Sequence, residues 1–524
     1  MSGSLLATET APVTIAFSEI PYDIQVPGTY VEIAANYSQA GLVAYPAKAL
    51  ILCPIASTGT AVALTPVQVF TPQQADVYFG TGSVGAAMCR AFLRANGWTP
   101  LWAMGITDAG GATASTWTIP IVFSATLTGA PGTLTLYIGG RPISITVTPG
   151  VDTATTVATA LQAAIVATPN LPVTVARTTF TLTLTARDKG SMPGQLPVAF
   201  NIMPGDTMPG GVTAGASNLT AVITPSVGTG VNSVANAMAA IPGTWFTHIV
   251  CPWTDGTSQA ALATELDRRF NSMVKLDARA FGFTSQTSLT NLLAVTSGLN
   301  SRFVSILGLQ NCPTPPWEMA ALYAAVSIFN LTNDPARQLR GLLLPGAVPP
   351  ANADILNLES EFQSMITGGM ATATVEPDGT VRIQRAVTTY QTAAGGVADS
   401  AWRDIMTAET ASRIRYDWES YVGLVYPRAK MAADGSLAAE YDDTIVTPRR
   451  MHSSWGARCR LYEQQGWIQN SQATVKASVF QLDASNPNRM NARQQYQQMN
   501  NLMVLAGQMQ FSLLAQQSST QQTQ

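Results

Sequence analysis

Apolar and polar positions alternate near the start of the chain, before any segment that is able to cover them. Ile24 and Val26 alternate with polar neighbours, a Pro-Gly break follows, and residues 29–33 resume the pattern, which is typical of a strand. A lone strand cannot satisfy its own backbone donors and acceptors. We therefore predict an N-terminal arm over residues 1–44 that pairs with a strand elsewhere; an ordinary strand inside its own domain is the alternative.

Two blocks of the chain, residues 45–108 and 226–370, combine short apolar runs with helical periodicity. Residues 49–52 form a continuous apolar run, as expected of a strand that is covered on both faces. Leu262 and Leu266 lie about one helical turn apart and predict a helix with one buried face. Strands that alternate with helices of this length indicate an α/β layered core assembled from both blocks.

The stretch between these blocks, residues 109–225, is rich in Thr, Gly, Ala and Pro. Apolar residues alternate with polar ones over residues 133–138 and again over residues 143–147, which predicts a hairpin. Asp152 is placed to cap a helix, and residues 180–184 give another alternating strand. We interpret the stretch as an inserted β-rich α+β domain.

The remainder, residues 371–524, predicts a C-terminal α+β domain that ends in a second arm. Its expected elements are a hairpin over 372–383, a long helix over 400–421, a strand over 474–482, a helix over 488–506 and a final strand over 508–514. The predicted fold class is α/β and α+β multidomain: an α/β layered core with an inserted β-rich α+β domain and extended N- and C-terminal arms.

Composition narrows the class of protein. Only 11% of the 524 residues are charged, against about 25% in typical soluble domains. Such a surface suits a chain that packs against copies of itself, or a secreted or virion protein. The net charge of −3 gives no electrostatic footprint for nucleic acid. Four arginines nevertheless cluster, and we interpret them as a solvated or subunit-facing patch, with nucleic-acid binding as the alternative: Arg449, Arg450, Arg458 and Arg460.

The chain shows no targeting or redox signal. It lacks the basic and apolar regions of a signal peptide, and its most apolar window, residues 319–331, is too short to span a bilayer. We expect assembly in the cytoplasm and no membrane insertion. The five cysteines form no C-x-x-C pair; buried thiols are the first interpretation, and a disulfide between subunits stays open. They are Cys53, Cys89, Cys251, Cys312 and Cys459.

Catalytic equipment is sparse. Residues 256–260, GTSQA, resemble the nucleophile segment of subtilisin-like serine hydrolases, but His248 precedes the serine by only ten residues and His452 follows it, against the order of that triad. Asp255 is better read as a helix cap. The G-x-G-x-x-G match at residues 80–85 is weak on its own, and we read it as a closely packed helix start. We expect no enzyme, no cofactor and no metal site.

Several stretches resemble contractile phage tail sheath proteins of the Mu-like type, in the order found in that family. They span nearly the whole chain: IPYDIQVPGTYVEI (20–33), FGTGS (79–83), GTLTLYIGGR (132–141), LTLTARDKG (182–190), NDPARQL (333–339), TTYQ (388–391) with the following helix (402–415), DASNPNRMN (483–491) and LAGQMQF (505–511). Gln338 stands where the family has proline. We therefore identify the chain as a member of this family.

The resemblance implies a structural subunit of a virion tail sheath. Such subunits form stacked hexameric rings in a helical polymer around an inner tail tube, and contraction of the polymer drives the tube through the host envelope. The implied partners are other copies of the chain, the tube protein, and a baseplate and tail terminator at the ends, with no direct contact to nucleic acid. The sheath of a tailocin or other contractile injection particle is the alternative, and a subtilisin-like hydrolase is a remote one.

Extended arms in this family add strands to the sheets of neighbouring subunits, a mode known as β-augmentation. For the tube-facing surface the candidates are the predicted helix over 488–506 and the arginine patch. The residues expected to contact other subunits through the two arms are Ile24, Val26, Tyr30, Val31, Ile33, Leu505, Met509, Phe511 and Leu513.

Overall fold

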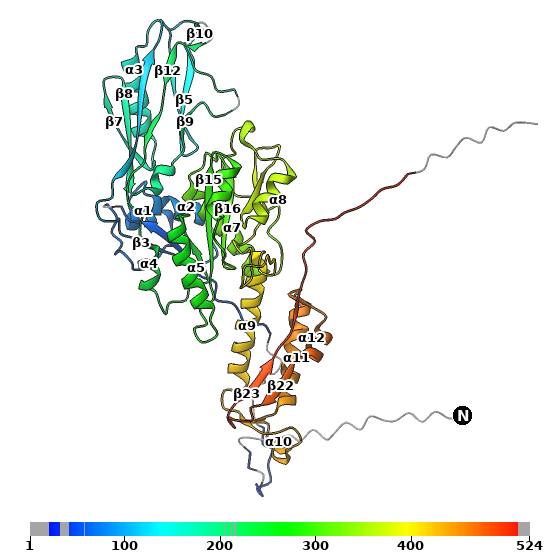
Figure 1. Cartoon of the computed structure of the whole chain (residues 1–524). Coiled ribbons are helices and arrows are strands. Elements are labelled where there is room, and N and C mark those ends of the chain that lie inside the picture. The colour runs from blue at the N-terminus through cyan, green and yellow to red at the C-terminus, as the bar shows by residue number, and fades with distance from the viewer. Residues whose placement is uncertain are drawn as a thin grey trace, which may run out of the picture.

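The computed structural model describes residues 20–21, 23–31, 41–56, 58–203, 205–210, 212–213 and 216–511. They form an elongated molecule with a strand-rich lobe at one end, a large sheet in the middle and a mainly helical body at the other end (Figure 1). We call these the strand-rich lobe (β4 to β13), the central sheet and the C-terminal body (β19 to β24). Several sheets and twelve α-helices among the described residues confirm the mixed α/β class.

The central sheet has eight strands in the order β18-β17-β16-β15-β14-β1-β3-β2. The six strands from β17 to β3 run parallel, and the outermost strands β18 and β2 are antiparallel to their neighbours. Their bounds are β1 Ala49–Pro54, β2 Val67–Gln68, β3 Leu101–Ile106, β14 His248–Val250, β15 Arg279–Gln286, β16 Val304–Gln310, β17 Ala371–Val375 and β18 Val381–Arg385.

Helices supply the crossovers that parallel strands require. Every residue of β1 is buried, as predicted from its apolar run, and helices α2 and α7 pack on each other and on the sheet. The short 3-10 segment η2 spans Asn352–Asp354. The helices are α1 Pro72–Phe79, α2 Val84–Ala95, α4 Val234–Ala240, α5 Gly256–Phe270, α6 Leu289–Thr296, α7 Pro316–Asn333 and α8 Glu359–Thr367.

The strand-rich lobe contains two larger sheets and one helix. The predicted hairpin is confirmed as β5–β6, but Thr153 rather than Asp152 is the N-cap of α3. Asp152 instead accepts a hydrogen bond from the Thr148 N–H (2.7 Å). The elements are β4 Ala114–Phe123, β5 Gly132–Ile138, β6 Arg141–Val147, α3 Ala154–Ala167, β7 Val173–Thr178, β8 Thr181–Lys189, η1 Met192–Gln195, β9 Val198–Phe200, β10 Val212–Thr213, β11 Ala216–Ser217, β12 Leu219–Ala221 and β13 Thr224–Ser226.

The lobe is attached to the middle of the molecule by buried polar contacts. A carboxylate oxygen of Asp188 on β8 accepts a hydrogen bond from the Val84 N–H at the start of α2 (2.7 Å). Burial raises the pKa of Asp188 to about 7. On the other side of the lobe, Arg141 lies 3.5 Å from Glu318 of α7. The hydrophobic core also runs without interruption from the central sheet into the lobe.

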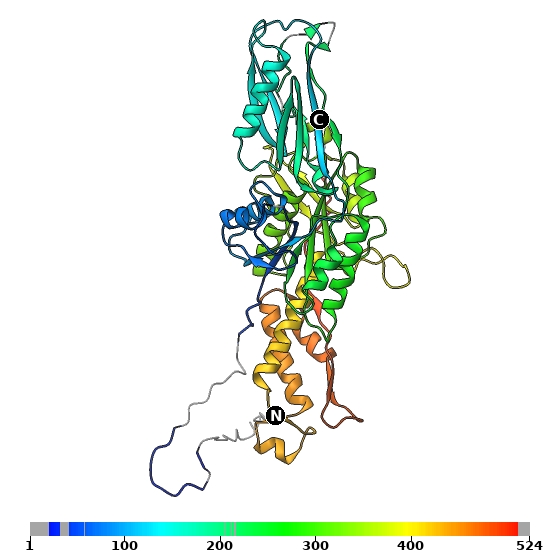
Figure 2. The same cartoon turned by 90° about the vertical axis from the view of Figure 1, so that its left-hand side faces the viewer.

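The C-terminal body follows the long helix α9, Ile405–Val425. It has its own small core around Trp455 and Tyr462. Figure 2 shows α9 and α11 side by side below the central sheet. The other elements are β19 Lys430–Met431, α10 Leu437–Tyr441, β20 Ile445–Val446, α11 Pro448–Gln464, β21 Ile468–Gln469, α12 Ser471–Ala477, β22 Val479–Leu482, β23 Met490–Arg493 and β24 Gln497–Gln498.

Two predicted elements of this body are wrong. The helix expected over 488–506 is absent: β23 and β24 occupy its first half, and residues 499–506 have no regular secondary structure. Gln, Arg and Met favour helices intrinsically, but strand pairing outweighs a propensity of a few tenths of a kcal/mol per residue. The strand expected over 474–482 begins only at Val479, because α12 occupies the preceding residues.

Candidate assembly arms and their anchoring

The N-terminal arm leaves its apolar side chains in solvent. Val26 is 66% and Val31 79% exposed, and Ile24 and Tyr30 are exposed as well. No residue of 23–31 pairs with a strand among the described residues, and the segment stands apart from the C-terminal body in Figure 2. Ile33 lies outside the described residues. An arm of this kind has apolar surface available for a partner.

Among the described residues of the N-terminal arm, Gly41 and Val43 are the first that form hydrogen bonds with the C-terminal half of the chain. The Val43 N–H donates to one carboxylate oxygen of Asp417 (2.8 Å), and Arg458 donates to the Gly41 carbonyl (3.2 Å). Arg458 Nε also donates to Asp417 (3.0 Å), and the Tyr462 hydroxyl donates to the same carboxylate (2.6 Å). We call Asp417, Arg458 and Tyr462 the arm anchor.

The arm anchor is a buried charge pair with its hydrogen bonds satisfied. The side chains of Arg458 and Asp417 are 1% and 2% exposed. Burial lowers the pKa of Arg458, but the contacts with Asp417 outweigh burial and raise it above its usual range, so Arg458 stays charged. This geometry corrects the interpretation of the arginine patch as wholly solvated or subunit-facing, because Arg458 faces inward.

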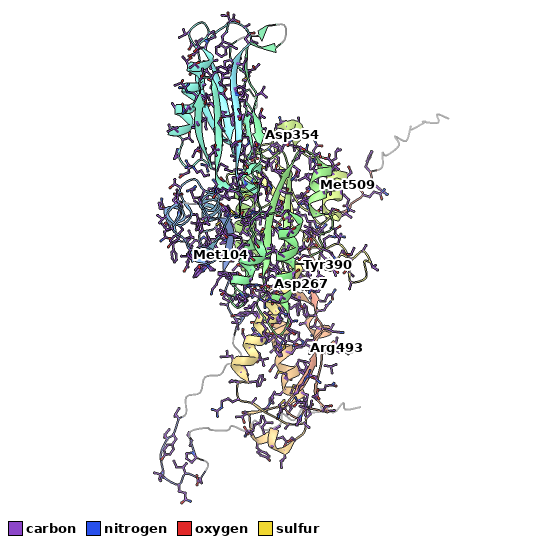
Figure 3. All side chains as sticks on the ribbon, turned by 60° about the vertical axis from the view of Figure 1, so that its left-hand side comes forward. Met104, Asp267, Asp354, Tyr390, Arg493 and Met509 are labelled. Atoms are coloured by element: carbon purple, nitrogen blue, oxygen red, sulfur yellow. The ribbon has the colours of Figure 1, made fainter. Side chains whose placement is uncertain are left out.

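The C-terminal arm is the more exposed of the two. Met509 is 99%, Phe511 87% and Leu505 84% exposed, while Leu513 lies outside the described residues. Residues 508–511, where a final strand is predicted, pair with no strand of the described chain. Met509 lies far from the C-terminal body, level with the central sheet (Figure 3).

Residues 501–503 hold the C-terminal arm against the core, and we call them the strap. The Asn501 side chain donates to the Ala336 carbonyl (2.9 Å) and accepts from the Gln338 N–H (3.1 Å). Gln338 donates from its side chain to the Leu502 carbonyl (3.0 Å). The residues that receive the strap belong to the NDPARQL segment, and the partly buried Met503 is the last arm residue that packs against the core.

Replacing Asn501 with alanine should loosen the strap without unfolding the protein. Two hydrogen bonds are lost, each contributing about 0.5–1.5 kcal/mol, so amide exchange in residues 499–503 should become faster while the melting temperature changes little. The control is Asn500→Ala, since Asn500 is exposed. Equal exchange rates in the two variants would show that the strap is not held by Asn501.

A two-stranded hairpin in the C-terminal body has open edges. β22 and β23 pair antiparallel from Val479↔Arg493 to Leu482↔Met490, and neither has another strand neighbour in the described chain. Phe480 packs inward against Trp418 and His452. The opposite face borders a hollow of about 320 Å³. An open edge of this kind is a template for an added strand.

The candidate catalytic and nucleotide motifs form no site. Asp255 caps α5 by accepting from the Ser258 N–H (2.9 Å), and Ser258 is buried. His248 bonds Thr247, and His452 bonds the Val475 carbonyl, so neither acts as a base for Ser258 in this geometry. At the glycine motif, the N-terminus of α2 is capped by Ser83 and Asp188.

A side chain on Gly85 would meet Cys53 Sγ at 2.8 Å, which explains that glycine by close packing. The five cysteines are buried free thiols. Among the described residues, no cluster of three or more His, Cys, Asp or Glu side chains is placed to hold a metal ion. No helix in the described part of the chain has the length and apolar character needed to cross a bilayer.

Comparisons with known proteins identify the chain. Residues 228–389 match the family described as phage tail sheath protein central domain. The Mu-like prophage FluMu tail sheath protein of Haemophilus influenzae is 29% identical over 502 residues, which covers 96% of this chain and all of that protein. The chain thus carries a match to the phage tail sheath central domain and is similar to a Mu-like tail sheath protein over nearly its whole length. The predicted resemblance to tail sheath proteins of the Mu-like type is thereby confirmed.

Solved structures similar to this chain share little sequence with it. A sheath tail protein of Listeria innocua is 12% identical, with a TM-score of 0.46 over 89% of this chain and 95% of that one. A chain of the anti-feeding prophage baseplate is 10% identical, with a TM-score of 0.49 over 94% of this chain and all of that one. The similarity of the chain to tail sheath proteins rests on the sequence matches.

The exposed arms were predicted from the sequence, but the residues that anchor them were not. Asp417 and Arg458 lie 41 residues apart, and the chain they hold lies more than 370 residues before Asp417. The sequence contained one signal for this ion pair: two opposite charges on two helices, in a chain that has few charged residues. The NDPARQL segment was used for the resemblance, but its role as the receiver of the strap was not visible in the sequence.

Proposed function

We propose that this chain is the structural subunit of a contractile tail sheath. In this proposal it polymerises helically as stacked hexameric rings around an inner tail tube and contracts to drive the tube through the host envelope. It is assembled in the host cytoplasm and meets a baseplate and a tail terminator at the two ends of the polymer. The sheath of a tailocin or another contractile injection particle is the alternative use of the same subunit.

One observation carries the proposal beyond the sequence comparisons: the described parts of both arms, residues 23–31 and 505–511, expose apolar side chains, and hydrogen bonds at Gly41, Val43 and Asn501 hold the arms to the rest of the molecule. Met509 is 99% exposed and therefore does not stabilise a monomer, because apolar surface contributes its stabilisation of about 25 cal/mol per Å² only when it is buried. In a polymer the same side chains are covered by neighbouring copies. The arms are therefore best understood as connectors between subunits.

We further propose that the β22–β23 hairpin receives a strand from a neighbouring copy. About five backbone hydrogen bonds at 0.5–1.5 kcal/mol each give a joint of several kcal/mol before side chains contribute. A contact between unlike surfaces that does not close on itself generates a helical polymer. Contraction is then a rigid-body change between two packed arrangements, with the arms keeping neighbours joined.

The domain division belongs to the same proposal. We assign residues 1–44 to the N-terminal arm, 45–108 with 226–370 to the core, 109–225 to the insert, and 371–524 to the C-terminal domain and arm. The insert supports this assignment because it leaves the core after β3 and returns before α4. The side chain of Asn232 joins the two crossing points by donating to the Ile106 and Thr107 carbonyls.

Electron microscopy of the purified protein tests the proposed function. The expected result is tubes or stacked rings, because nothing besides other copies is needed to cover the arms. A strict monomer at high concentration, shown by sedimentation and by empty micrographs, would contradict the proposal. A serine hydrolase receives no support from the geometry, and an unchanged polymer in Ser258→Ala would agree with that.

A further inference from the structure

The strand-rich lobe meets the core close to α2 (Figure 1), and a carboxyl group is buried at this boundary. Asp188, near the end of β8, is 3% exposed, and one of its oxygens accepts a hydrogen bond from the N–H of Val84, the first residue of α2 (2.7 Å). The other oxygen, Oδ1, is buried and has no hydrogen-bond donor among the described residues. A buried oxygen without a donor is an unfavourable place for a negative charge, because nothing offsets the hydration that it has lost.

The charged side chains around Asp188 do not supply that missing partner. Arg187 precedes it on β8, but successive side chains of a strand point to opposite faces, and Arg187 donates to the Leu171 carbonyl instead (2.9 Å). Asp108, in the segment after β3, adds a like charge, and its carboxylate accepts from Asn232 (3.4 Å). Within the described chain, Asp188 thus has no cationic partner in direct contact.

Burial has the largest effect on the titration of Asp188. It raises the pKa of Asp188 from 3.8 to about 7, and the charge of Asp108 acts in the same direction. The hydrogen bond from Val84 and the charge of Arg187 oppose this rise but are outweighed. Cys53 of β1 also interacts with Asp188, but burial raises the pKa of its thiol well above the usual value, so the thiol brings no charge. Asp188 therefore changes its charge near neutral pH, where most carboxyl groups are fully ionised.

We propose that this boundary is a pH-responsive contact: protonated Asp188 holds β8 against the start of α2, and ionisation of Asp188 loosens the lobe from that helix. Opening hydrates both carboxylate oxygens, so the charged form favours the open arrangement. A carboxyl group whose pKa is raised in the closed arrangement stabilises that arrangement fully below the ordinary pKa of 3.8 and no longer does so once the pH exceeds about 7. The contact is tight in mild acid and loosens toward neutral pH. The inference goes beyond the proposed function, because one subunit contains the whole contact.

A second attachment keeps the lobe on the core when the Asp188 contact opens. Arg141, the first residue of β6, lies 3.5 Å from Glu318 in the first turn of α7. Burial raises the pKa of Glu318 above its usual 4.5, although the charge of Arg141 opposes the rise. This attachment therefore responds to pH in the same direction but retains an ion-pair partner. We expect the loosening to be local to the N-terminus of α2 rather than a release of the whole lobe.

Hydrogen exchange followed by mass spectrometry tests the contact, because the Val84 N–H reports its opening directly. The full-length chain is compared at about pH 5.5 and about pH 8, with rates corrected for the intrinsic pH dependence of exchange, and sedimentation checks that the assembly state is the same at both. In the wild type, the protection of residues 80–92 should fall roughly tenfold or more, while that of β16 stays constant. Asp188→Asn keeps an acceptor for the Val84 N–H but does not ionise, so its protection should change by less than about threefold.

Asp152→Asn is the matched control. Asp152 is a lobe aspartate that also accepts a backbone N–H at 2.7 Å but is only half-buried, so this variant should keep the wild-type pH dependence. An equal loss of protection in the wild type and in Asp188→Asn, or constant protection in the wild type, would overturn the proposal. If Asp188→Asn melts well below the wild type, Asp188→Ser, which is also non-ionisable, takes its place. Every comparison is made within one assembly state, so failure of the proposed function leaves this test intact.

Discussion

Deleting residues 507–524 should abolish polymer formation and leave the fold of the subunit unchanged. Among the described residues, the last contact of this arm with the core is at Met503, and Met509 and Phe511 lie in solvent, so we expect the deletion to leave the packing of the body intact. Loss of a strand joint of about 3–7 kcal/mol weakens each connection at least about a hundredfold. Electron microscopy and sedimentation report the polymer, and thermal melting reports the fold.

A shorter deletion provides the matched control. Removing residues 516–524 takes away a polar, glutamine-rich stretch but leaves the apolar pattern of the arm, so polymers should persist. Deleting residues 1–35 should act like the deletion of 507–524, since it removes the other arm ahead of its anchor at Gly41. Polymers that form without either arm, or a lowered melting temperature in the deletions, would contradict the assignment of the arms as connectors.

Replacing Glu409 with glutamine should destabilise the fold by about 3–5 kcal/mol, the usual result of breaking a buried charge cluster. Glu409 lies on α9, 1% exposed, within 3.7 Å of His248 and Arg279 and 4.0 Å of Arg413. These contacts join α9 to strands β14 and β15. Glutamine leaves the cations without a counter-charge, and chemical unfolding measures the loss.

The pH dependence of folding stability provides a second test of the same buried charge cluster. Burial raises the pKa of Glu409, but His248, Arg279 and Arg413 together outweigh burial and hold it at about 2, below the usual 4.5. A lowered folded-state pKa gives stability that is complete above the unfolded pKa and is lost as pH falls through the folded pKa. The free energy of unfolding of the wild type should therefore fall toward that of Glu409→Gln as the pH falls from about 4.5 to 2.

Glu419 on the same helix is the control for Glu409. It faces Lys275 at 3.4 Å, and both side chains are at least one-third exposed, so Glu419→Gln should change stability by less than about 1 kcal/mol. Equal effects at positions 409 and 419 would show that the buried cluster does not hold α9 to the sheet.

Local patterns predicted the elements whose neighbours are close in sequence. The apolar run at 49–52 became the fully buried β1, the alternation on both sides of the turn after Ile138 became β5–β6, and the apolar window at 319–331 lies within α7. In each case one period of hydrophobicity matched one element. Helix capping by Asp255 was likewise visible because the cap and its helix are adjacent.

Long-range pairings were beyond local patterns. Residues 488–506 look helical by composition, yet Gln498 pairs with Ile468, 30 residues earlier in the chain. Arg458 looks like a surface charge until Asp417 is found on another helix. The exposed arms were predicted because their apolar residues lack any covering segment nearby, and for that reason their partners are not visible in one sequence.

A cryo-electron microscopy map of the polymer tests the central claim most directly. We expect residues 23–31 of one subunit to be extended and hydrogen-bonded to the β22–β23 hairpin of another, with Met509 and Phe511 covered by a neighbouring copy. Arms folded back onto their own subunit, or left in solvent while the bodies alone form the contacts, would contradict it.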